Sequence, residues 1–370
     1  MRILYGVVGE GMGHAIRSRV VLDELVKRHD VQVVVSGRAH DYLAQRAGEH
    51  LQVRKIWGYT MVTEDNEVRN FRTLLSNVRG AIAGGWPLNV RAYFDIARRF
   101  QPDVVISDFE SWSYLFAVNH RLPVISLDNV QMVNRCQHAP EIVRGHEADF
   151  QIAKGVVKTK VPRAFHYLIT TFFYPPVRKR RTTLHPPVLR PEVLAARAEP
   201  GAHLLVYQTY TTHAELPRLL EKTGLECRIY GLRRDLREPV REGKLVYMPF
   251  SERQLVEDLR TARGVVASGG FTLMSEAVYL HRPVLAEPVG KQFEQILNAR
   301  YLESLGYGMC AEPIDERALS TFLERIPDFE AKLSTYSQDG NRDLLAKLDE
   351  VLQAASRGGA VVEPEDPSIA

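Results

Sequence analysis

The sequence is poor in the features that mark secreted, membrane-spanning and nucleic-acid-binding proteins. It holds only three cysteines, Cys136, Cys227 and Cys310, whose odd number and wide spacing argue against a disulfide framework or a zinc site. No apolar run reaches the roughly 20 residues of a membrane span, and the first residues lack the basic segment and long apolar core of a signal peptide. The net charge of +3 is too small to indicate nucleic-acid binding. We therefore expect a cytoplasmic protein.

What the sequence does contain is enough apolar material for two domains of ordinary size. Of its 370 residues, 45% are hydrophobic and 25% are charged, which suits a globular protein with buried cores. Short apolar runs alternate with helical periodicity in both halves, beginning with the strand-like run 2–8 and the amphipathic stretch 15–27. This alternation predicts an α/β fold with doubly wound parallel sheets. Further strands are expected at 31–36, 53–57, 104–107, 124–127, 203–207, 228–230, 244–248, 264–268 and 284–286.

A glycine-rich loop, Gly9-Glu-Gly-Met-Gly13-His14, follows the first predicted strand. A dinucleotide-binding loop has the pattern G-x-G-x-x-G, but the third glycine position is His14 here. Ser36 and Gly37 also stand where a dinucleotide-binding protein carries an acidic residue for the adenine ribose. The sequence therefore argues against a nicotinamide-dependent oxidoreductase.

The most informative segment is 265–308. An apolar run is followed by Gly269 and Gly270, and helical periodicity then begins at Thr272. Two glycines let the backbone approach a ligand, and the free N–H groups and positive dipole end of a helix start suit a diphosphate. Glu276 lies one turn deeper on the same face, where a carboxylate can accept hydrogen bonds from a ribose diol. A glycine pair before a helix also occurs as an ordinary turn.

A second polar pair follows the next predicted strand. The strand at 284–286 leads into a loop over 288–294, and ligands of open α/β sheets bind at the carboxyl ends of the strands. Glu294 and Gln295 therefore lie where sugar hydroxyls are expected, and the next helix is expected to begin near Asn298.

The order of these pieces resembles the donor site of GT-B fold glycosyltransferases. That pattern has a glycine pair, a Thr or Ser, a helix Glu, a strand entry before Pro, and an acidic-Gln pair three residues before Asn-Ala. The chain departs from it at His281, which replaces the usual glycine of the strand entry, and uses Glu294 in the acidic position. The whole chain is similar to uncharacterised prokaryotic glycosyltransferases related to the UDP-glycosyltransferases and the peptidoglycan-precursor N-acetylglucosaminyltransferase. This resemblance implies two Rossmann-like domains that face each other across a cleft.

The resemblance also implies where the donor binds. The diphosphate would be held by Gly269, Gly270, Phe271 and Thr272. The ribose would be held by Glu276, and the donor sugar by Glu294 and Gln295. Two further loops of the second domain complete this expected site: Gln208 and Thr209 face the diphosphate, and Met248 and Phe250 clasp the nucleobase.

The glycine loop of the first domain supplies the predicted general base. An acceptor hydroxyl is a poor nucleophile at neutral pH, and His14 is expected to take its proton. Asp108, at the carboxyl edge of the same sheet, is expected to hydrogen-bond His14 and fix its tautomer. Other interpretations stay open: His14 can contact phosphate, Asp108 can cap a helix, and Glu10 or Glu110 can be the base. The loop residues expected at phosphate or acceptor are Glu10, Gly11 and Gly13.

The domain limits follow from composition. A proline-rich stretch with little periodicity predicts the interdomain linker, and its basic cluster at 178–181 is either a solvated loop or a contact with an anionic membrane. The predicted division is an acceptor-binding domain at 1–173, the linker at 174–199, a nucleotide-sugar-binding domain at 200–337, a helix packing back on the first domain at 338–357, and a disordered tail at 358–370.

The resemblance implies an inverting, metal-independent transfer of a hexose-type sugar from a UDP-sugar to an acceptor hydroxyl or amine. Helix N–H groups would stabilise the leaving diphosphate, and the sequence has no Asp-x-Asp pair. No cofactor is expected, because the nucleotide sugar is a co-substrate. The acceptor stays open between a small molecule, a lipid, a nucleoside and a glycan. Two other functions of this fold stay open as well, a sugar-nucleotide 2-epimerase and a non-catalytic sugar-nucleotide sensor.

Overall fold

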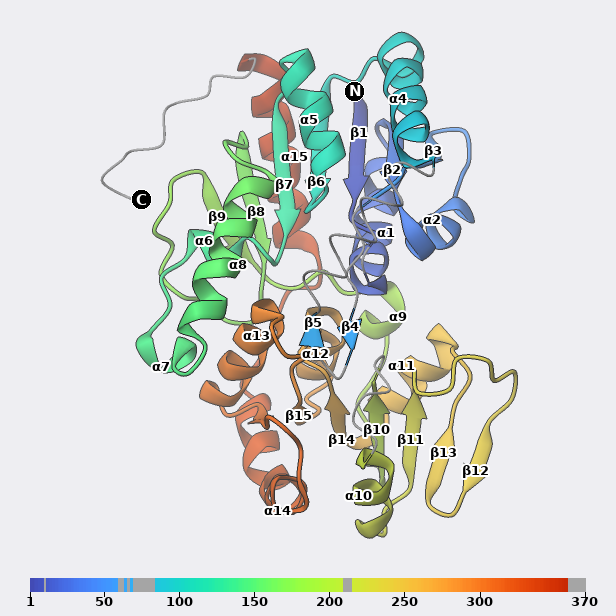
Figure 1. The fold of residues 1–370 in the computed structure, drawn as a ribbon, viewed down its shortest axis with the longest axis vertical. Helices are drawn as coiled ribbons and strands as arrows, with labels where there is room; N and C mark the ends of the chain where they lie inside the picture. Colours follow the sequence, from blue (N-terminus) through green and yellow to red (C-terminus); the bar gives the residue numbers. More distant parts are fainter. Residues whose placement is uncertain (10, 59–62, 65–66, 69–83, 209–214, 359–370) are drawn as a thin grey trace.

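The computed structural model describes residues 1–9, 11–58, 63–64, 67–68, 84–208 and 215–358. Two α/β units lie one above the other, with the N-terminus in the upper unit (Figure 1). Each unit is built on a seven-stranded sheet. The predicted residues Glu10 and Thr209, and 359–370 of the predicted tail, lie outside the described residues.

The first sheet has the strand order β3-β2-β1-β6-β7-β8-β9, and all its neighbouring strands are parallel. Helices cover both faces, so the inner strands are unbroken runs of buried residues, as parallel sheets require. The strands are β1 (Arg2–Val7), β2 (Asp30–Val35), β3 (Leu51–Lys55), β6 (Val104–Asp108), β7 (Val124–Asp128), β8 (His166–Thr170) and β9 (Thr182–His185). Its helices are α1 (Met12–Leu25), α2 (Gly37–Ala44), α4 (Trp86–Asp95) with the π-helical Ile96–Phe100, α5 (Ser111–His120), α6 (Met132–Arg135), α7 (Pro140–Val143) and α8 (Glu147–Lys160). Two short antiparallel strands, β4 (Thr63–Glu64) and β5 (Glu67–Val68), pair with each other.

The second sheet has the order β12-β13-β11-β10-β14-β15-β16 and is parallel except for its edge strand β12. Its strands are β10 (His203–Tyr207), β11 (Cys227–Tyr230), β12 (Val240–Glu242), β13 (Leu245–Tyr247), β14 (Ala262–Ala267), β15 (Val284–Ala286) and β16 (Gly308–Cys310). The remaining helices are α9 (Pro191–Leu194), α10 (Leu216–Lys222), α11 (Glu252–Arg260), α12 (Phe271–Tyr279), α13 (Phe293–Ser304), α14 (Glu316–Leu333) and α15 (Arg342–Gly358). The predicted α/β fold with two doubly wound sheets is confirmed.

The segment 174–199 is not a linker throughout. Its residues Thr182–His185 form β9, which pairs with β8 and gives the first sheet its seventh strand. The prolines that flank this short run obscured its strand pattern. An edge strand needs partners on one side only, so four paired residues among the nine between the two proline pairs suffice. The chain crosses between the sheets after His185.

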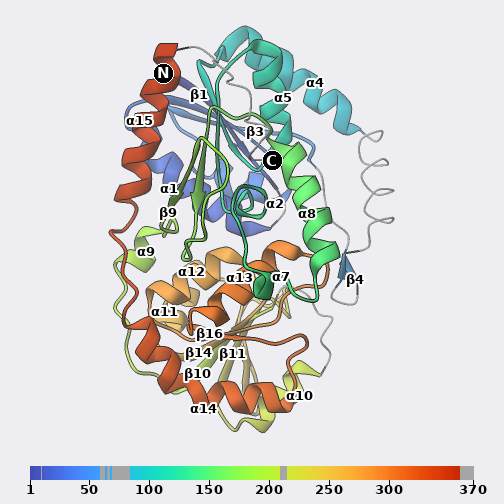
Figure 2. The same ribbon diagram turned by 90° about the vertical axis from the view of Figure 1, so that its left-hand side faces the viewer.

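The two units are joined by two crossings that lie against each other. Asn341, just before α15, donates from Nδ2 to the Leu189 carbonyl at 2.7 Å and accepts from the Leu189 N–H at 2.9 Å. The helix α15 then runs along the first unit, on the left in Figure 2, and its Leu348 and Val351 are buried in the same apolar cluster as Ile3. The chain therefore ends its described part on the domain where it began.

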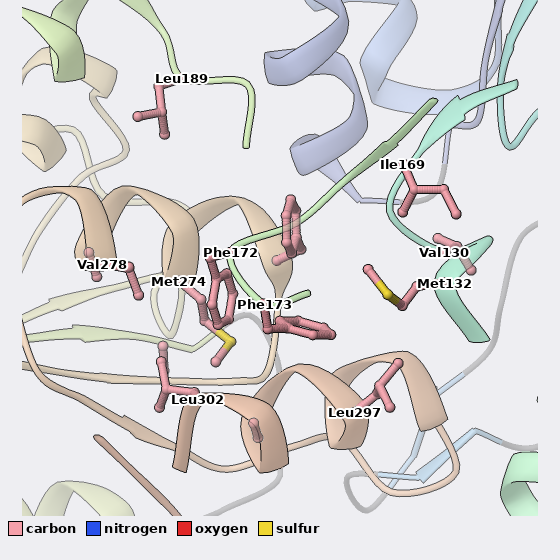
Figure 3. Packing of buried hydrophobic residues seen from close by; sticks show 14 of the residues in the cluster. Val130, Met132, Ile169, Phe172, Phe173, Leu189, Met274, Val278, Leu297 and Leu302 are labelled. Atoms are coloured by element: carbon pink, nitrogen blue, oxygen red, sulfur yellow. The ribbon is translucent and has the colours of Figure 1, made fainter. Parts of the chain in front are cut away.

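One part of the interface between the units is apolar. One buried cluster contains Met132 and Phe172 of the first unit together with Met274 and Leu297 of the second (Figure 3). Phe172 stacks on Phe271, with 5.9 Å between the ring centroids. Because an interface of this kind resembles a core, it holds the two units in register beside the cavity described next.

Candidate active site

A cavity of about 350 Å³ lies between the two units. Its walls come from the turn before α1 and from α8 on one side, and from the starts of α12 and α13 on the other. The predicted site residues that line it are Gly11, Gly13, His14, Phe250, Gly270, Phe271, Thr272, Glu276, Glu294 and Gln295. Residues predicted from opposite ends of the sequence therefore surround one space.

His14 lies in the first turn of α1, because this helix begins at Met12, earlier than the sequence pattern predicts. Gly11 precedes the helix with a φ of 78°, a conformation that costs glycine nothing and that other residues avoid. Across the cavity, a Cβ on Gly13 would stand 2.7 Å from the Thr272 hydroxyl oxygen. Glycine at position 13 therefore allows the start of α1 to meet the start of α12.

His14 and Asp108 form the hydrogen-bonded pair that the sequence predicts for the general base. Nδ1 of His14 lies 2.7 Å from Oδ1 of Asp108, at the end of β6, and Asp108 is fully buried. Nη2 of Arg17 lies 2.5 Å from the same Asp108 oxygen and 2.9 Å from Nδ1. An ionised carboxylate only accepts, so the contact with Asp108 is a hydrogen bond when Nδ1 carries the proton, and the Arg17 guanidinium, which only donates, then bonds the carboxylate and not Nδ1. This tautomer leaves Nε2 as a proton acceptor.

Asp108 is held in its ionised form. Burial opposes ionisation, but the Arg17 guanidinium and His14 outweigh it and keep the pKa of Asp108 below its ordinary value. The Ser18 hydroxyl donates to the other carboxylate oxygen at 3.0 Å. An ionised and fully hydrogen-bonded carboxylate orients the imidazole and stabilises the imidazolium that forms when His14 takes a proton.

The capping role considered for Asp108 belongs to Glu110. The Glu110 carboxylate accepts from the backbone N–H groups of Trp112 and Ser113, at 2.8 and 2.6 Å, in the first turn of α5. Burial raises its pKa despite these bonds. Glu110 does not line the cavity, so the geometry favours His14 over Glu110 as the base.

The two glycines before α12 differ in what surrounds them. A Cβ on Gly269 would stand 2.3 Å from the Gln295 carbonyl oxygen, so this glycine allows β14 and α13 to pack closely. A Cβ on Gly270 would meet open space, and Gly270 lines the cavity at the N-cap position of α12. Because Gly270 has no side chain, it leaves the N–H groups in the first turn of α12 uncapped. These groups lie at the position where a diphosphate is predicted.

Glu276 has a partner that the sequence interpretation missed. Both of its carboxylate oxygens accept from Arg190, at 2.7 Å from Nε and 2.8 Å from Nη2, and each residue is only 2% exposed. Arg190 belongs to the crossing between the units. Burial opposes its charge, but Glu276 and Glu252 keep the pKa of Arg190 above its ordinary value. The predicted ribose ligand is thus half of a buried ion pair at the cavity wall.

Glu294 and Gln295 lie in the first turn of α13 rather than in a loop, because this helix begins at Phe293. Oε1 of Glu294 accepts from Asn129 of the first unit at 2.7 Å. Gln295 accepts from the Val289 N–H at 3.1 Å, which fixes the loop after β15. The early helix start places both side chains at the cavity, with N–H groups of the first turn beside them.

The two loops predicted for the diphosphate and nucleobase contribute unequally. Gln208 is buried and accepts from the Ser268 hydroxyl at 2.9 Å, behind the cavity wall. Met248 is buried in the apolar cluster and does not line the cavity. Phe250, which is 59% exposed, does line it. Of Gln208, Met248 and Phe250, only Phe250 can contact a ligand in the cavity.

Arg17, Asn129 and Arg190 are three residues of the cavity wall that sequence analysis did not identify. Nη1 of Arg17 donates to Asn129 at 3.0 Å, and Asn129 in turn donates to Glu294, so hydrogen bonds link His14 to the donor side. One signal for Arg17 was present in the sequence. Arg17 lies one turn after His14, on the face of α1 that must pack against the sheet. An arginine buried there needs an acidic partner.

Two Rossmann-like units around a shared cavity define a GT-B fold glycosyltransferase. The chain belongs to glycosyl transferase family 1, whose sequence pattern matches residues 1–327. A relative from Methanosarcina acetivorans, described as an uncharacterized glycosyltransferase, is 23% identical over 347 residues and covers 83% of this chain and 85% of its own. The predicted enzyme class, a glycosyltransferase, is confirmed.

Solved structures share this fold. The Phytolacca americana UGT2 complex with UDP-2fluoro-glucose and pterostilbene matches 96% of this chain and 100% of its own, at a TM-score of 0.63 and 15% identity. Arabidopsis thaliana UGT89C1 with UDP matches 97% and 96%, at a TM-score of 0.60 and 15% identity. The glycosyltransferase of kitacinnamycin matches 96% and 97%, at 0.60 and 16%.

Within the described ranges, no helix combines the length and the apolar character that crossing a bilayer takes. In the same part of the chain, no three His, Cys, Asp or Glu side chains gather in a way that would hold a metal ion.

Proposed function

We propose that this glycosyltransferase inverts the anomeric configuration of its donor, a UDP-sugar, and works without a metal ion, with His14 as general base toward an acceptor hydroxyl or amine. The observation that carries the proposal is the His14–Asp108 pair, which faces the uncapped start of α12 across one cavity. A base on one domain and an anion-binding helix start on the other are the two elements that a single displacement requires.

The donor side supports a nucleoside diphosphate sugar. The start of α12 offers backbone N–H groups and the positive end of the helix dipole, and the Thr272 hydroxyl lies beside them. These groups would stabilise the charge that develops on the leaving diphosphate. We infer UDP as the nucleotide because structures of the same fold were solved in complex with UDP and with UDP-2fluoro-glucose.

In the proposed reaction, Nε2 of His14 takes the proton of the acceptor hydroxyl while its oxygen attacks the anomeric carbon. The bond between that carbon and the diphosphate oxygen breaks, and its electron pair leaves with UDP. Asp108 stays ionised and stabilises the imidazolium. Attack from the face opposite the leaving group inverts the configuration.

Replacing His14 tests this assignment. His14→Ala should lower turnover by about 10²–10⁴-fold, which is typical for loss of a general base, with nearly unchanged affinity for UDP. His40→Ala, on α2 outside the cavity, is the matched control and should keep full activity. Turnover by rapid-quench assay and UDP binding by calorimetry separate the two effects, and equal activity of His14→Ala would eliminate His14 as the base.

The stereochemistry and the rival functions need their own measurements. Proton NMR of the product should show the anomeric configuration opposite to that of the donor, and retention would overturn the single displacement. Conversion of donor in the absence of any acceptor would favour the 2-epimerase. Thermal stabilisation across a panel of nucleoside diphosphates identifies the base, because a ligand of the folded state raises its stability.

A further inference from the structure

Arg190 occupies an unusual position for a residue that lines a substrate cavity. It comes from the crossing between the two sheets, immediately before α9, and not from the loops of either sheet. Its guanidinium is buried and holds the Glu276 carboxylate by two hydrogen bonds, at 2.7 and 2.8 Å. Both side chains line the cavity. The crossing thus sets the position of the carboxylate that faces the ligand.

The Arg190–Glu276 pair keeps hydrogen-bonding capacity for a ligand. A carboxylate has about four lone-pair directions, and Arg190 uses one on each oxygen, so two stay available to hydroxyl donors. On the arginine, Nη1 is a buried donor that makes no hydrogen bond within the described part of the chain and lies 3.6 Å from the Glu252 carboxylate. A ribose presents both kinds of partner, since its hydroxyls donate as well as accept.

Charge explains why an arginine is needed here. A diphosphate at the start of α12 would be repelled by a bare carboxylate on the same helix that is only 2% exposed. Pairing with Arg190 makes the local charge neutral while the carboxylate keeps its acceptor oxygens. A rigid bidentate pair also fixes the direction of those oxygens, which a lysine, as a point charge, would not.

We propose that Arg190 is a positioning residue for the donor nucleotide: it orients Glu276 so that the enzyme recognises the ribose hydroxyls and distinguishes ribonucleotides from 2′-deoxyribonucleotides. The proposal rests on the proposed function in taking a uridine nucleotide as the donor.

Further ion pairs connect Arg190 and Glu276 to the first domain. Arg19 of α1 donates to Glu252 of α11 at 2.9 Å and to Glu192 of α9 at 3.0 Å, and Glu252 in turn faces Arg190. Charges of alternating sign therefore run from the helix that carries His14 through the crossing to Glu276. Ribose recognition is tied by this network to the relative placement of the two domains.

Binding of UDP and 2′-deoxy-UDP, measured by calorimetry, tests the proposal. The wild type should prefer UDP by about tenfold, the value expected for a hydrogen bond to a charged group. Arg190→Met should reduce this preference to about threefold or less, and Arg190→Lys should give an intermediate preference. Glu276→Gln should also reduce the preference, and adding Arg190→Met to it should reduce the preference little further, because both changes act through one carboxylate.

Arg282→Met is the matched control. Arg282 is a buried arginine of the second domain that bonds backbone carbonyls away from the cavity, so its loss should weaken folding without changing the preference. If Arg190→Met weakened both ligands by the same factor, or if the wild type bound them equally, the positioning role would be overturned. A wild type that bound no UDP would instead overturn the UDP donor of the proposed function and this inference with it.

Discussion

Asp108→Asn is the change that most directly tests the proposed base. The carboxylate accepts from His14 at 2.7 Å, from Arg17 at 2.5 Å and from Ser18 at 3.0 Å. Asparagine has nearly the same shape but presents one acceptor oxygen and an NH₂ group that can only donate. If the NH₂ group faces Nδ1, the imidazole must move its proton to Nε2, and the nitrogen nearest the acceptor can no longer take a proton.

The expected magnitude follows from two separate losses. The wrong tautomer should lower turnover by about 10⁴-fold, the order seen when an orienting carboxylate is changed to its amide in hydrolases with a comparable pair. The buried Arg17 also loses its charged partner, and breaking a buried ion pair costs about 3–5 kcal/mol of folding stability. The activity must therefore be measured at a temperature where thermal unfolding shows that the variant is folded.

Two controls separate these losses. Ser18→Ala removes one hydrogen bond to the same carboxylate without changing the tautomer, and turnover should fall by less than about tenfold, as for a single neutral hydrogen bond. UDP affinity should be unchanged in both variants, because Asp108 lies behind His14 and does not line the cavity. A folded Asp108→Asn enzyme with wild-type turnover would refute the role of the pair.

Two further predictions concern buried acids, Glu276 at the cavity and Asp128 at the end of β7. Glu276→Ala should weaken UDP binding by about 1–3 kcal/mol through lost ribose hydrogen bonds, and unchanged affinity in the folded variant would remove Glu276 from the donor site. Asp128 is fully buried, and burial and then Asp108 raise its pKa to about 6, above an unfolded value of about 3.9. Between these two values the folded state binds more protons, so this group lowers stability as pH rises through that window. Asp128→Asn should therefore stabilise the protein at pH 7 by about 3 kcal/mol, with the gain vanishing near pH 4, and urea denaturation at both pH values that showed no difference would contradict this.

The architecture could be predicted because strands buried in a parallel sheet have unbroken apolar sequences. Central strands such as β1 and β14 were located to within two residues at each end. The strand β9 was missed because it is only four residues long and lies within the nine residues between two proline pairs, and as an edge strand it pairs on one side only. Local pattern therefore located most of the buried inner strands, but it missed the inner strand β8 as well as the edge strands β9, β12 and β16.

The candidate site shows the same limit. Residues in a glycine turn after a strand, such as His14 and Gly270, were found because ligands of open α/β sheets bind at the carboxyl ends of the strands and because the order of the motifs resembles that of GT-B fold glycosyltransferases. Arg17 and Arg190 were missed because their roles depend on partners 91 and 86 positions away in the sequence. Helix starts mattered too. The early starts of α1 and α13 turned predicted loop residues into residues of a first helical turn.

The proposed base and the proposed donor site belong to different domains, so catalysis depends on how those domains meet. They meet through contacts that tolerate little variation: Gly13 beside Thr272, Asn129 bonded to Glu294, and the ion pairs that lead from Arg19 to Glu276. The pairs Asn129–Glu294 and Arg190–Glu276 line the cavity, while the apolar cluster of Figure 3 lies beside it. Apolar packing stabilises the interface but is not directional, whereas hydrogen bonds and ion pairs form only at particular distances and angles. The polar contacts are therefore the ones that set the distance from His14 to the start of α12, and substitutions among them should alter turnover more than substitutions of equal size in the apolar cluster.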